Sequence, residues 1–557
     1  MVDAGVDPPG TWRSQLFPPD WLPVHAGAQP DDAGRFLPDF SFAGYHQGEL
    51  FPPVGAPRAT TITVSAALGN GTTDATGGIQ AALDQACAAG GGVVLLGAGT
   101  YRLVLPSASA TSVLNLTCSN LVLRGQGPSQ TRLLFDDPLR ARGVAVISVR
   151  GGGSQNDTNA ARRWPLAQDV GVESRAVRLA VDAGFQAGDW VMVMSDTTEA
   201  FRVDHRMDQP TSGLAGLWPT AGWPGLRSVR QVAGVSGRDV TFTTPLRYPL
   251  KTRDAARVYG GPSFIREVGL ESFSIGMTEN VTTPSGGTEA SRENDYTVEG
   301  TTGYQVHNNR AVVFDRMHDG WLFDVDTWRP PGNSSQTHLL SKGLVLSVSA
   351  AHVTIEGCDF ANPQYRGGGG NGYLFEVLGG EHLFLRGSAT GARHGYIINE
   401  AASGNVFREV EVINSRMSDD SHRFLAHANL YDRVRLDRGW LQAVNRGTTS
   451  TGAGFTATQH VFWGTHVVAN HPTAQGAAVE SAQWGWGYLI GSSADAGAQA
   501  RLRADSFTNS TWRQLDQGAP EDWVEGVDAG ASLHPFSLHA EQLRLRCQRE
   551  ARACVTW

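Results

Sequence analysis

Lysine is almost absent from this chain of 557 residues: only Lys251 and Lys342 occur among its 45 basic residues. We attribute most of this bias to codon usage. Acidic residues number 54, so the formal net charge is −9. A negative balance of this size argues against the broad basic surface that nucleic-acid binding needs. We therefore expect no nucleic-acid partner.

Cysteine is scarce as well, with five residues, no C-x-x-C pair and no zinc-type spacing. The odd count predicts no disulfide framework, although Cys547 and Cys554 are close enough in sequence to bridge in an oxidising compartment. No apolar run approaches the length of a membrane span, so we expect no spanning segment. Residues 1–5 are not typical of a signal peptide, which fits either a cytosolic start or a start left after signal removal.

Glycine is abundant instead, at 67 residues. Many glycines are expected where a chain turns tight corners that need a left-handed backbone. The length allows one large core, so we predict a single large solenoid with additions rather than several globular domains.

A short helix is predicted near the start of the regular structure, where apolar side chains recur at i, i+3, i+4 and i+7: Ile79, Ala82, Leu83 and Ala86. Thr73, Asp74 or Thr76 is suited to cap its start, and the glycines at 90–92 end it. The apolar run 93–96 then predicts a buried strand. A helix followed by a buried strand suits a cap over the open end of a parallel stack.

Residues 69–101 carry a longer pattern as well. They resemble the opening of the pectate-lyase and polygalacturonase-like superfamily, where G-D/N-G-x-T-D-x-T-x-A-I-Q-x-A-[ILV] leads to G-G-G-x-V-x-[LVF]-P-x-G-x-Y. Ala75 stands where a second Asp is common, and Gly97 where Pro is common. The resemblance implies an all-β, right-handed parallel β-helix (solenoid) with an N-terminal helix cap. It leaves the reaction open, because one fold carries many chemistries.

Four regions differ in composition and pattern. Residues 1–60 are rich in Pro, Gly and Asp, and we predict an extended arm that packs along the solenoid. Residues 61–500 form the predicted β-helix. Alternating segments within about 176–260 predict a small antiparallel β insertion. Residues 501–557 are predicted to be a tail that packs on the last coil, with one helix around 538–549.

Apolar strand-like segments recur after residue 262, and the last five repeat every 23 to 30 residues: 269–275, 352–358, 382–388, 405–410, 430–436 and 460–465. This period suits one solenoid coil of three short strands and three corners. His352, His382 and His460 open equivalent segments. Repeated, stacked side chains of this kind are usually structural, so we predict that these three histidines form a corner ladder.

Four corner segments break the repeat with polar, aromatic and glycine residues: 365–373, 392–400, 418–429 and 439–458. Because one coil advances about 4.8 Å, residues at equivalent corners come close together. The corner pairs spaced by about one coil are Arg366/Asn371, Arg393/His394, His422/Arg423 and Asn445/Arg446. We predict that these residues line one groove along the solenoid.

An elongated groove with arginines and aromatic groups suits a linear acidic sugar chain, because guanidinium forks bind carboxylates or sulfates. We therefore predict a polysaccharide or oligosaccharide partner, bound outside the cell or in the periplasm. The predicted substrate-binding residues are Arg366, Asn371, Tyr396, Glu400, Asp420, Arg423, His427, Trp440 and Asn445.

Three functions compete at this groove. We rank β-elimination at a uronic acid first, with His394, His422 or Lys342 as the base and Arg393 or Arg446 neutralising the substrate carboxylate. Hydrolysis by paired carboxylates is the alternative, with candidates Asp419, Asp420 and Glu400. Glycan binding without cleavage ranks last, because it does not require histidines beside arginines.

Several signatures of the resembling families are missing. The Asn-Thr-Asp, Gly-His-Gly and Arg-Ile-Lys hallmarks of polygalacturonases do not occur, which weakens the hydrolase alternative. The Arg-x-Pro-x-x-Arg and Trp-Ile-x-Asp-His signatures of calcium pectate lyases are also absent, so no motif supports calcium. We expect a polysaccharide lyase that needs no metal or other cofactor.

Overall fold

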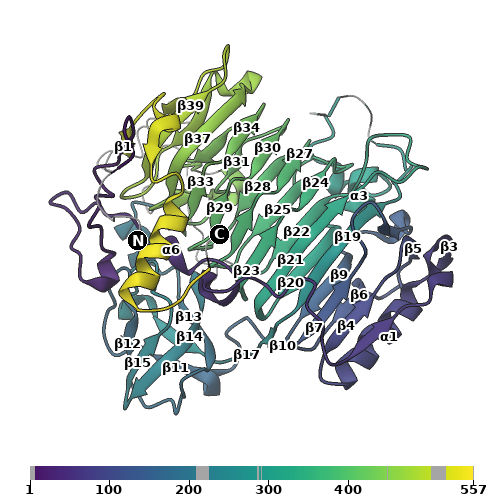
Figure 1. Cartoon of the computed structure of the whole chain (residues 1–557), viewed down its shortest axis with the longest axis horizontal. Coiled ribbons are helices and arrows are strands. Elements are labelled where there is room, and N and C mark those ends of the chain that lie inside the picture. The colour runs from purple at the N-terminus through teal and green to yellow at the C-terminus, as the bar shows by residue number, and fades with distance from the viewer. Residues whose placement is uncertain are drawn as a thin grey trace.

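The computed structural model describes residues 7–207, 225–284, 286, 288–289, 291–447, 449–503 and 522–555. The chain forms a parallel β-helix, and a lobe of antiparallel strands lies beside its later coils (Figure 1). The predicted all-β parallel solenoid is therefore confirmed. Part of the predicted tail, residues 504–521, lies outside the described residues.

Three parallel faces make up the solenoid. The strands of the first face pair in the order β2 (Thr61–Thr63), β4 (Gly92–Leu95), β7 (Leu121–Arg124), β19 (Gly269–Met277), β21 (Met317–Thr327), β23 (Ala350–Glu356), β26 (Leu383–Leu385), β29 (Val406–Arg408), β33 (Leu430–Asp432), β37 (Val461–Ala469), β39 (Tyr488–Ala494) and β41 (Trp523–Glu525). Each of the six segments of the predicted repeat contributes a strand to this face, and the ends of some, such as 430–436, continue past the corner into the next face.

The second face adjoins the first across a single corner. It contains β3 (Asn70–Asp74), β5 (Gly99–Leu103), β8 (Thr131–Phe135), β24 (Asp359–Ala361), β27 (Ser388–Thr390), β30 (Glu411–Ile413) and β34 (Arg435–Asp437). The later halves of β19, β21, β37 and β39 complete it.

The third face carries the features that matter most for function. Its strands are β6 (Ser112–Leu116), β9 (Ala145–Arg150), β20 (Arg310–Asp315), β22 (Lys342–Leu346), β25 (Tyr373–Val377), β28 (His394–Ile398), β31 (Asp419–Asp420), β35 (Leu441–Ala443), β38 (Ala477–Ser481) and β40 (Arg501–Arg503). An isolated bridge between Ile398 and Ser421 joins β28 to β31, so the face is continuous.

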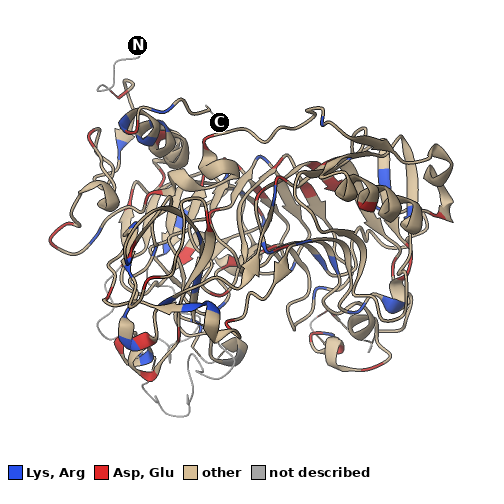
Figure 2. Ribbon diagram, turned by 90° about the horizontal axis from the view of Figure 1, so that it is seen from below, with Lys and Arg blue, Asp and Glu red and all other residues tan. Residues whose placement is uncertain are grey.

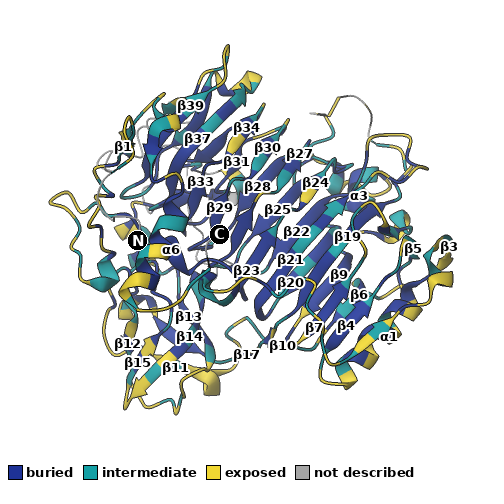
Figure 3. Ribbon diagram, viewed as in Figure 1, coloured by how far each residue is buried: buried dark blue, intermediate teal, exposed yellow. Residues whose placement is uncertain are grey.

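The interior of the solenoid is apolar, and its strands are largely buried, as the dark blue ribbon of Figure 3 shows. Equivalent aromatic rings stack from coil to coil on the first face: Phe384 on Phe407 at 4.8 Å and Phe407 on Tyr431 at 5.1 Å between ring centroids. On the third face Phe375 stacks on Tyr396 at 4.8 Å. The short strands of each coil are stable only within the stack, because the neighbouring coils cover both edges of each strand.

Each coil turns into the first face through one residue with a left-handed backbone. This corner column contains Asp319, His352, Glu381, Ala428 and Gln459, with φ between 50° and 60°. Their backbone N–H groups donate to the next coil, as Glu381 does to the Ser403 carbonyl at 3.0 Å. Gly404 continues the column because a Cβ there would lie 2.4 Å from the Glu381 carboxylate. Acidic residues and histidine therefore occupy corners where glycine would be expected.

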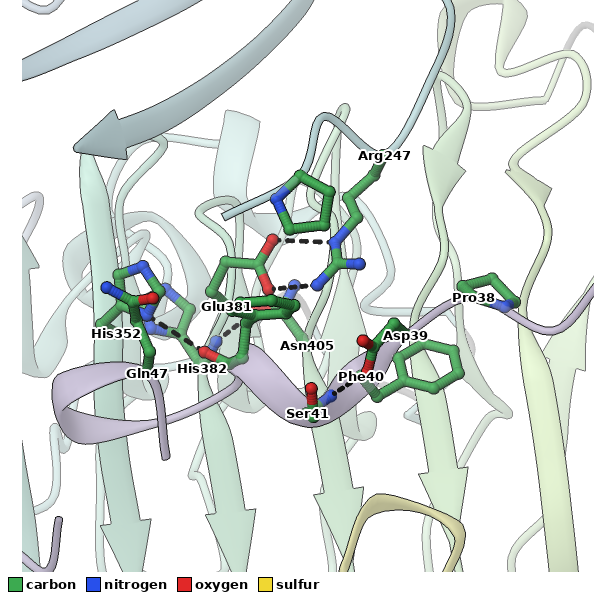
Figure 4. Close-up of polar contacts among 12 residues, drawn as sticks. Pro38, Asp39, Phe40, Ser41, Gln47, Arg247, His352, Glu381, His382 and Asn405 are labelled. Carbon is green, nitrogen blue, oxygen red and sulfur yellow. Dashed lines mark hydrogen bonds and ion pairs between the residues drawn. The ribbon is translucent and has the colours of Figure 1, made fainter. Parts of the chain in front are cut away.

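The N-terminal arm runs along this corner column, as predicted. The Gly44 N–H donates to the Glu381 carbonyl at 2.8 Å, and the Tyr45 N–H donates to the Thr354 hydroxyl at 2.9 Å. Asp319 accepts from the His46 N–H at 3.0 Å. Figure 4 shows the arm around Ser41 passing the strand ends beside His352 and His382.

The antiparallel lobe has the strand order β11 (Arg163–Pro165), β16 (Arg257–Tyr259), β13 (Trp190–Ser195), β14 (Leu226–Ser236), β15 (Asp239–Phe242) and β12 (Ala176–Arg178). The predicted insertion began at about residue 176. The sheet begins earlier because Trp164 pairs antiparallel with Val258, which adds an edge strand before the expected start.

A buried ion cluster joins the lobe to the solenoid. The Arg247 guanidinium donates to both oxygens of the Glu381 carboxylate at 3.0 and 2.8 Å, and to Glu173 at 3.1 Å (Figure 4). Arg230 donates to Glu381 at 3.1 Å. All four side chains are 0–1 % exposed. The lobe is therefore held to the corner column by charges that have no access to water.

Helices and disulfides close the two ends. The cap helix α1 (Thr76–Ala88) buries the predicted stripe, including Ile79 and Leu83, and α6 (Leu538–Arg549) occupies the predicted range of the tail helix. Disulfides join Cys87 to Cys118 and Cys547 to Cys554, whereas Cys358 is free and buried. The Cys87–Cys118 bridge corrects the expectation that the odd cysteine count gives no framework. Among the described residues, no helix is long and apolar enough to cross a bilayer.

We predict that Arg247→Met lowers the free energy of unfolding by about 3–5 kcal/mol, because Glu173 and Glu381 would keep buried charges without their main partner. Urea denaturation followed by circular dichroism measures the change. Arg178→Met is the matched control in the same lobe, since Arg178 pairs with Asp239 at the surface and exposed pairs contribute little. Equal losses in the two variants would contradict a structural role for the cluster.

Candidate functional site

An open cleft of about 830 Å³ lies between the third face and the lobe. The solenoid contributes Arg310, Lys342 and Glu376 to its lining, and the lobe contributes Arg227 and Arg257. Charges of both signs are spread along the described ribbon in Figure 2. The cleft is concave and has polar groups on both walls, as substrate sites do.

One row of side chains crosses the floor of the third face. Arg310, Lys342, Tyr373 and His394 are the first residues of β20, β22, β25 and β28. Arg310 pairs with Lys342 and Tyr373 with His394, and the pairing of Leu344 with Phe375 places Lys342 opposite Tyr373. Since parallel strands stack about 4.8 Å apart, the four residues form a ladder.

Sequence reasoning identified only half of this row, because Arg310 and Tyr373 were not among the predicted site residues. A usable signal was present: each of the four polar residues opens an apolar run of strand length. Their equivalent positions in the coils were hard to recognise from the sequence, because the segments that connect the four strands differ in length and amino-acid composition.

Lys342 and Glu376 form an ion pair in the cleft floor. The Lys342 ammonium lies 2.5 Å from Oε2 of Glu376, and the Asn399 amide donates to Oε1 at 2.9 Å. Both charged side chains are 9 % exposed. We had predicted Lys342 as a candidate catalytic base. The ion pair engages its amine with Glu376, which argues against the predicted role of Lys342 as the base.

Glu400 is the carboxyl group of the cleft that remains uncommitted. It is half-buried, lines the cleft, and makes no hydrogen bond or ion pair with any residue that the structure describes. Burial raises the pKa of Glu400 above its ordinary value, although Arg423 and Arg227 act in the opposite direction. The carboxylate of Glu376 adds to the upward shift. A carboxyl group in this environment is suited to hold a proton.

A second cluster surrounds Asp420 at the end of the row. The Arg446 Nη1 lies 2.5 Å from Oδ2 of Asp420 and 2.7 Å from Nδ1 of His422. Nδ1 of His394 and Nδ1 of His422 each lie 3.5 Å from Oδ1 of Asp420. Burial would raise the pKa of Asp420, but His394 and Arg446 hold it well below its usual range. Burial lowers the pKa of His422 and brings that of His394 to about 3.

These residues also have the composition of a metal site. His394, Asp420 and His422 each place one potential ligand atom within 4.8 Å of the others. The guanidinium of Arg446, however, contacts both His422 and Asp420. A metal ion would have to bind beside this fixed positive charge or displace it. The cluster therefore fits an internal ion pair better than a metal centre.

The predicted single groove is wrong for the first two corners. Arg366 pairs with Glu289 at 2.8 Å, and Arg393 pairs with Glu293 at 2.6 Å. These acidic residues belong to a connection that the sequence analysis did not consider. Arg366 lines a second hollow of about 750 Å³, and neither Arg366 nor Arg393 lines the cleft that contains Lys342 and Glu400.

Other predicted contact residues are inside the protein. Tyr396 is part of the interior aromatic stack, and Asn371 is buried and accepts from the Asn308 N–H at 2.9 Å. His427 is buried beside Tyr248 of the lobe, with ring centroids 5.4 Å apart. Trp440 and Asn445 are also buried. The prediction that these residues contact substrate is therefore wrong. In irregular corner segments the sequence does not distinguish inward-facing from outward-facing positions.

Two further expectations have clear outcomes. Asp419, a candidate carboxylate for hydrolysis, is fully buried and accepts from the Tyr396 N–H at 3.0 Å. Burial raises the pKa of Asp419 well above its usual value. The histidine ladder is confirmed: His352, His382 and His460 have no exposed surface, and Nδ1 of His382 accepts from the Val353 N–H at 3.2 Å.

Comparison with known proteins adds similarity in fold only. Neither a protein-family model nor a curated protein matches the sequence. One similar solved structure is the tailspike protein gp49 of Pseudomonas phage LKA1, with 12 % identity, coverage of 75 % of this chain and 70 % of that chain, and a TM-score of 0.35. A second is the A-module of mannuronan C-5 epimerase AlgE6 of Azotobacter vinelandii, with 13 % identity, coverage of 84 % of this chain and 98 % of that chain, and a TM-score of 0.29. A third is DFA-IIIase of Arthrobacter chlorophenolicus A6 in complex with GF2, with 10 % identity, coverage of 80 % of this chain and 90 % of that chain, and a TM-score of 0.37. At these TM-scores the similarities carry no argument about function.

We predict that Arg446→Met destabilises the protein by about 3 kcal/mol, because Asp420 would remain charged and buried without its partner. The double variant Arg446→Met/Asp420→Asn should lose much less than the sum of the two single variants. Urea denaturation of the four proteins in this double-mutant cycle provides the test. Additive losses would show that the pair does not form the centre of the cluster.

Proposed function

We propose that the protein hydrolyses glycosidic bonds of an acidic polysaccharide that lies in the cleft. One observation carries the proposal: the cleft contains two carboxyl groups in opposite environments. Glu376 is bound by an ammonium and an amide, whereas Glu400 has no partner among the described residues and a raised pKa. A pair of carboxyl groups with separated environments is the arrangement that acid–base hydrolysis of glycosides uses.

The two groups would have different tasks. Glu400 donates its proton to the glycosidic oxygen of the leaving sugar. Lys342 and Asn399 bind the two oxygens of Glu376. Glu376 acts on the other side of the bond, on water or on the sugar itself. Neither proposed step uses a metal ion.

β-Elimination, which we ranked first from the sequence, becomes the second candidate. Tyr373, His422 and Arg446 lie together beside the cleft floor, with the Tyr373 hydroxyl 3.5 Å from Nε2 of His422. The Nδ1 of His422 accepts from Arg446, so the neutral ring carries its proton on Nε2. That nitrogen cannot remove a substrate proton. Arg446 is committed to Asp420, which further weakens its predicted role as the uronate neutraliser.

The proposed location remains outside the cytoplasm. Two disulfides, Cys87–Cys118 and Cys547–Cys554, favour an oxidising compartment. A polysaccharide too large to enter a cell would be met in the same place.

We predict that incubation with the acidic polysaccharide substrate releases new reducing ends without absorbance at 235 nm. Polygalacturonate, alginate and a sulfated galactan form the test panel. Glu400→Gln should lower turnover by about 100- to 10,000-fold, the usual contribution of general acid–base catalysis. Glu411→Gln is the control, because Glu411 pairs with Arg435 on the second face. New absorbance would identify elimination, and binding without either product would identify a non-catalytic module.

The pH dependence provides a separate prediction. Hydrolysis needs Glu400 protonated, so kcat/KM should fall as the pH rises through the pKa of Glu400. Arg423 lowers that pKa, so Arg423→Gln should move this alkaline limb to higher pH. Initial rates between about pH 4 and 9 measure the shift. Activity that instead declines as the pH falls toward the histidine range would support a neutral histidine base.

A further inference from the structure

Two arginines of the cleft have no acidic partner. Arg227 belongs to β14 of the lobe and Arg310 opens β20 of the solenoid, so they line the cleft from different walls. Within the part of the chain that the structure describes, no carboxylate lies within 4.0 Å of either guanidinium. The two arginines differ in this respect from Arg257 and Lys342, the other basic residues of the lining, which both form ion pairs.

The acidic groups around them are already neutralised. Arg257 pairs with Asp157 and with Asp196, and Lys342 pairs with Glu376. Asp315 pairs with Arg316 at 2.6 Å. Glu400 is the remaining acid of the lining; burial raises its pKa, and it forms no ion pair with the described residues. These pairings leave Arg227 and Arg310 as the guanidiniums of the lining that have no acidic partner among the described residues.

The hydrogen bonds of the two guanidiniums are also incomplete. Arg227 makes one long bond, from Nη1 to Oδ1 of Asn156 at 3.4 Å, and Arg310 donates from Nη2 to the Gly143 carbonyl. The Nε–H of each is shielded from solvent and has no acceptor. A buried donor without an acceptor is costly. Binding of an oxyanion by the same guanidinium would supply both a charge partner and acceptor oxygens.

We propose that Arg227 and Arg310 are two anion subsites that bind acidic groups of the polysaccharide on either side of the cleaved bond. This proposal rests on the proposed function for the position of that bond and deepens it by assigning the recognition of acidic sugars. Planar guanidinium groups suit carboxylates and sulfates alike. The predicted anion-binding arginines Arg366 and Arg393 would have no part in it, because the protein's own glutamates bind them.

Their positions relative to the two carboxyl groups agree with this assignment. Glu400 is the charge that acts most strongly on Arg227, and Glu376 is the one that acts on Arg310. Each arginine therefore lies near one of the proposed catalytic groups without contacting it. An acidic sugar bound at Arg227 or Arg310 would be next to the sugar that reacts.

Binding to the Glu400→Gln protein, which is expected to leave the polymer intact, tests the proposal. The probes are polygalacturonate, alginate, a sulfated galactan and the carboxyl-reduced form of polygalacturonate, compared by affinity electrophoresis. We expect at least one acidic polymer to bind and the reduced polymer to bind at least tenfold more weakly. Arg227→Gln and Arg310→Gln should each weaken binding of the acidic polymer roughly tenfold, the scale of one charge-assisted contact.

Arg227→Lys and Arg310→Lys should keep part of this affinity. Arg238→Gln, an exposed arginine of the same lobe, is the control with the same change in charge and should have no effect. The salt dependence of the unchanged site is a second measurement that needs no variant at the two arginines: rising NaCl should weaken binding. Preference for the carboxylated or the sulfated polymer identifies which acidic group is bound.

The outcomes separate the two proposals. Equal binding of acidic and reduced polymers, failure of all three acidic polymers to bind, or unchanged affinity in both glutamine variants would overturn the anion subsites. Equal cleavage of acidic and reduced polymers by the wild-type protein would also overturn them while leaving hydrolysis in place. Arginine-dependent binding by a protein that cleaves none of the polymers would overturn the hydrolysis and leave the subsites standing.

Discussion

The buried contact between Arg247 and Glu381 is the constraint on which the functional part of the structure depends. Glu381 is a left-handed corner residue of the solenoid, and Arg247 belongs to the lobe. Both side chains are buried away from water, and a buried charge is tolerated only with its partner in place. The backbone carbonyl of Glu381 also accepts from the Gly44 N–H of the arm. Three regions distant in sequence, the arm, the lobe and the solenoid, therefore meet at Glu381. The lobe thereby becomes a fixed wall of the cleft.

The opposite wall obtains its chemistry from strand register. A parallel stack repeats the position of a side chain every coil, so a polar residue at the start of several strands becomes a ladder. Arg310 and Lys342 are consecutive members of that ladder. Their charges differ in effect because Lys342 has Glu376 as a partner, whereas the guanidinium of Arg310 has none within the described chain. The repeat of the coils places these side chains in one row. Whether a member of the row is available to a ligand depends on whether a nearby carboxylate already pairs with it.

Much of the architecture was predictable, because periodicity depends on neighbouring residues. The cap stripe around Ile79, the repeated strands and the ladder containing His382 all follow from spacing within a segment. The site was less predictable. Arg393 appeared suited to bind an acidic sugar, but Glu293 neutralises it from a distant connection. Tyr396 appeared to be a groove aromatic, but it stacks in the core. Each error concerns a side chain whose role depends on a partner far along the chain.

The sequence by itself determined the solenoid, its cap and its antiparallel addition, since the burial of a short strand or an amphipathic helix requires a local apolar pattern that is visible in the chain. Only the tertiary structure decided which charges remain available. Lys342, Arg393 and Arg446 all find carboxylates across the fold, while Glu400 and Arg227 line the cleft without an ion pair to the described residues. Pairing of charges depends on distances between coils and lobe, and no spacing along the chain records those distances.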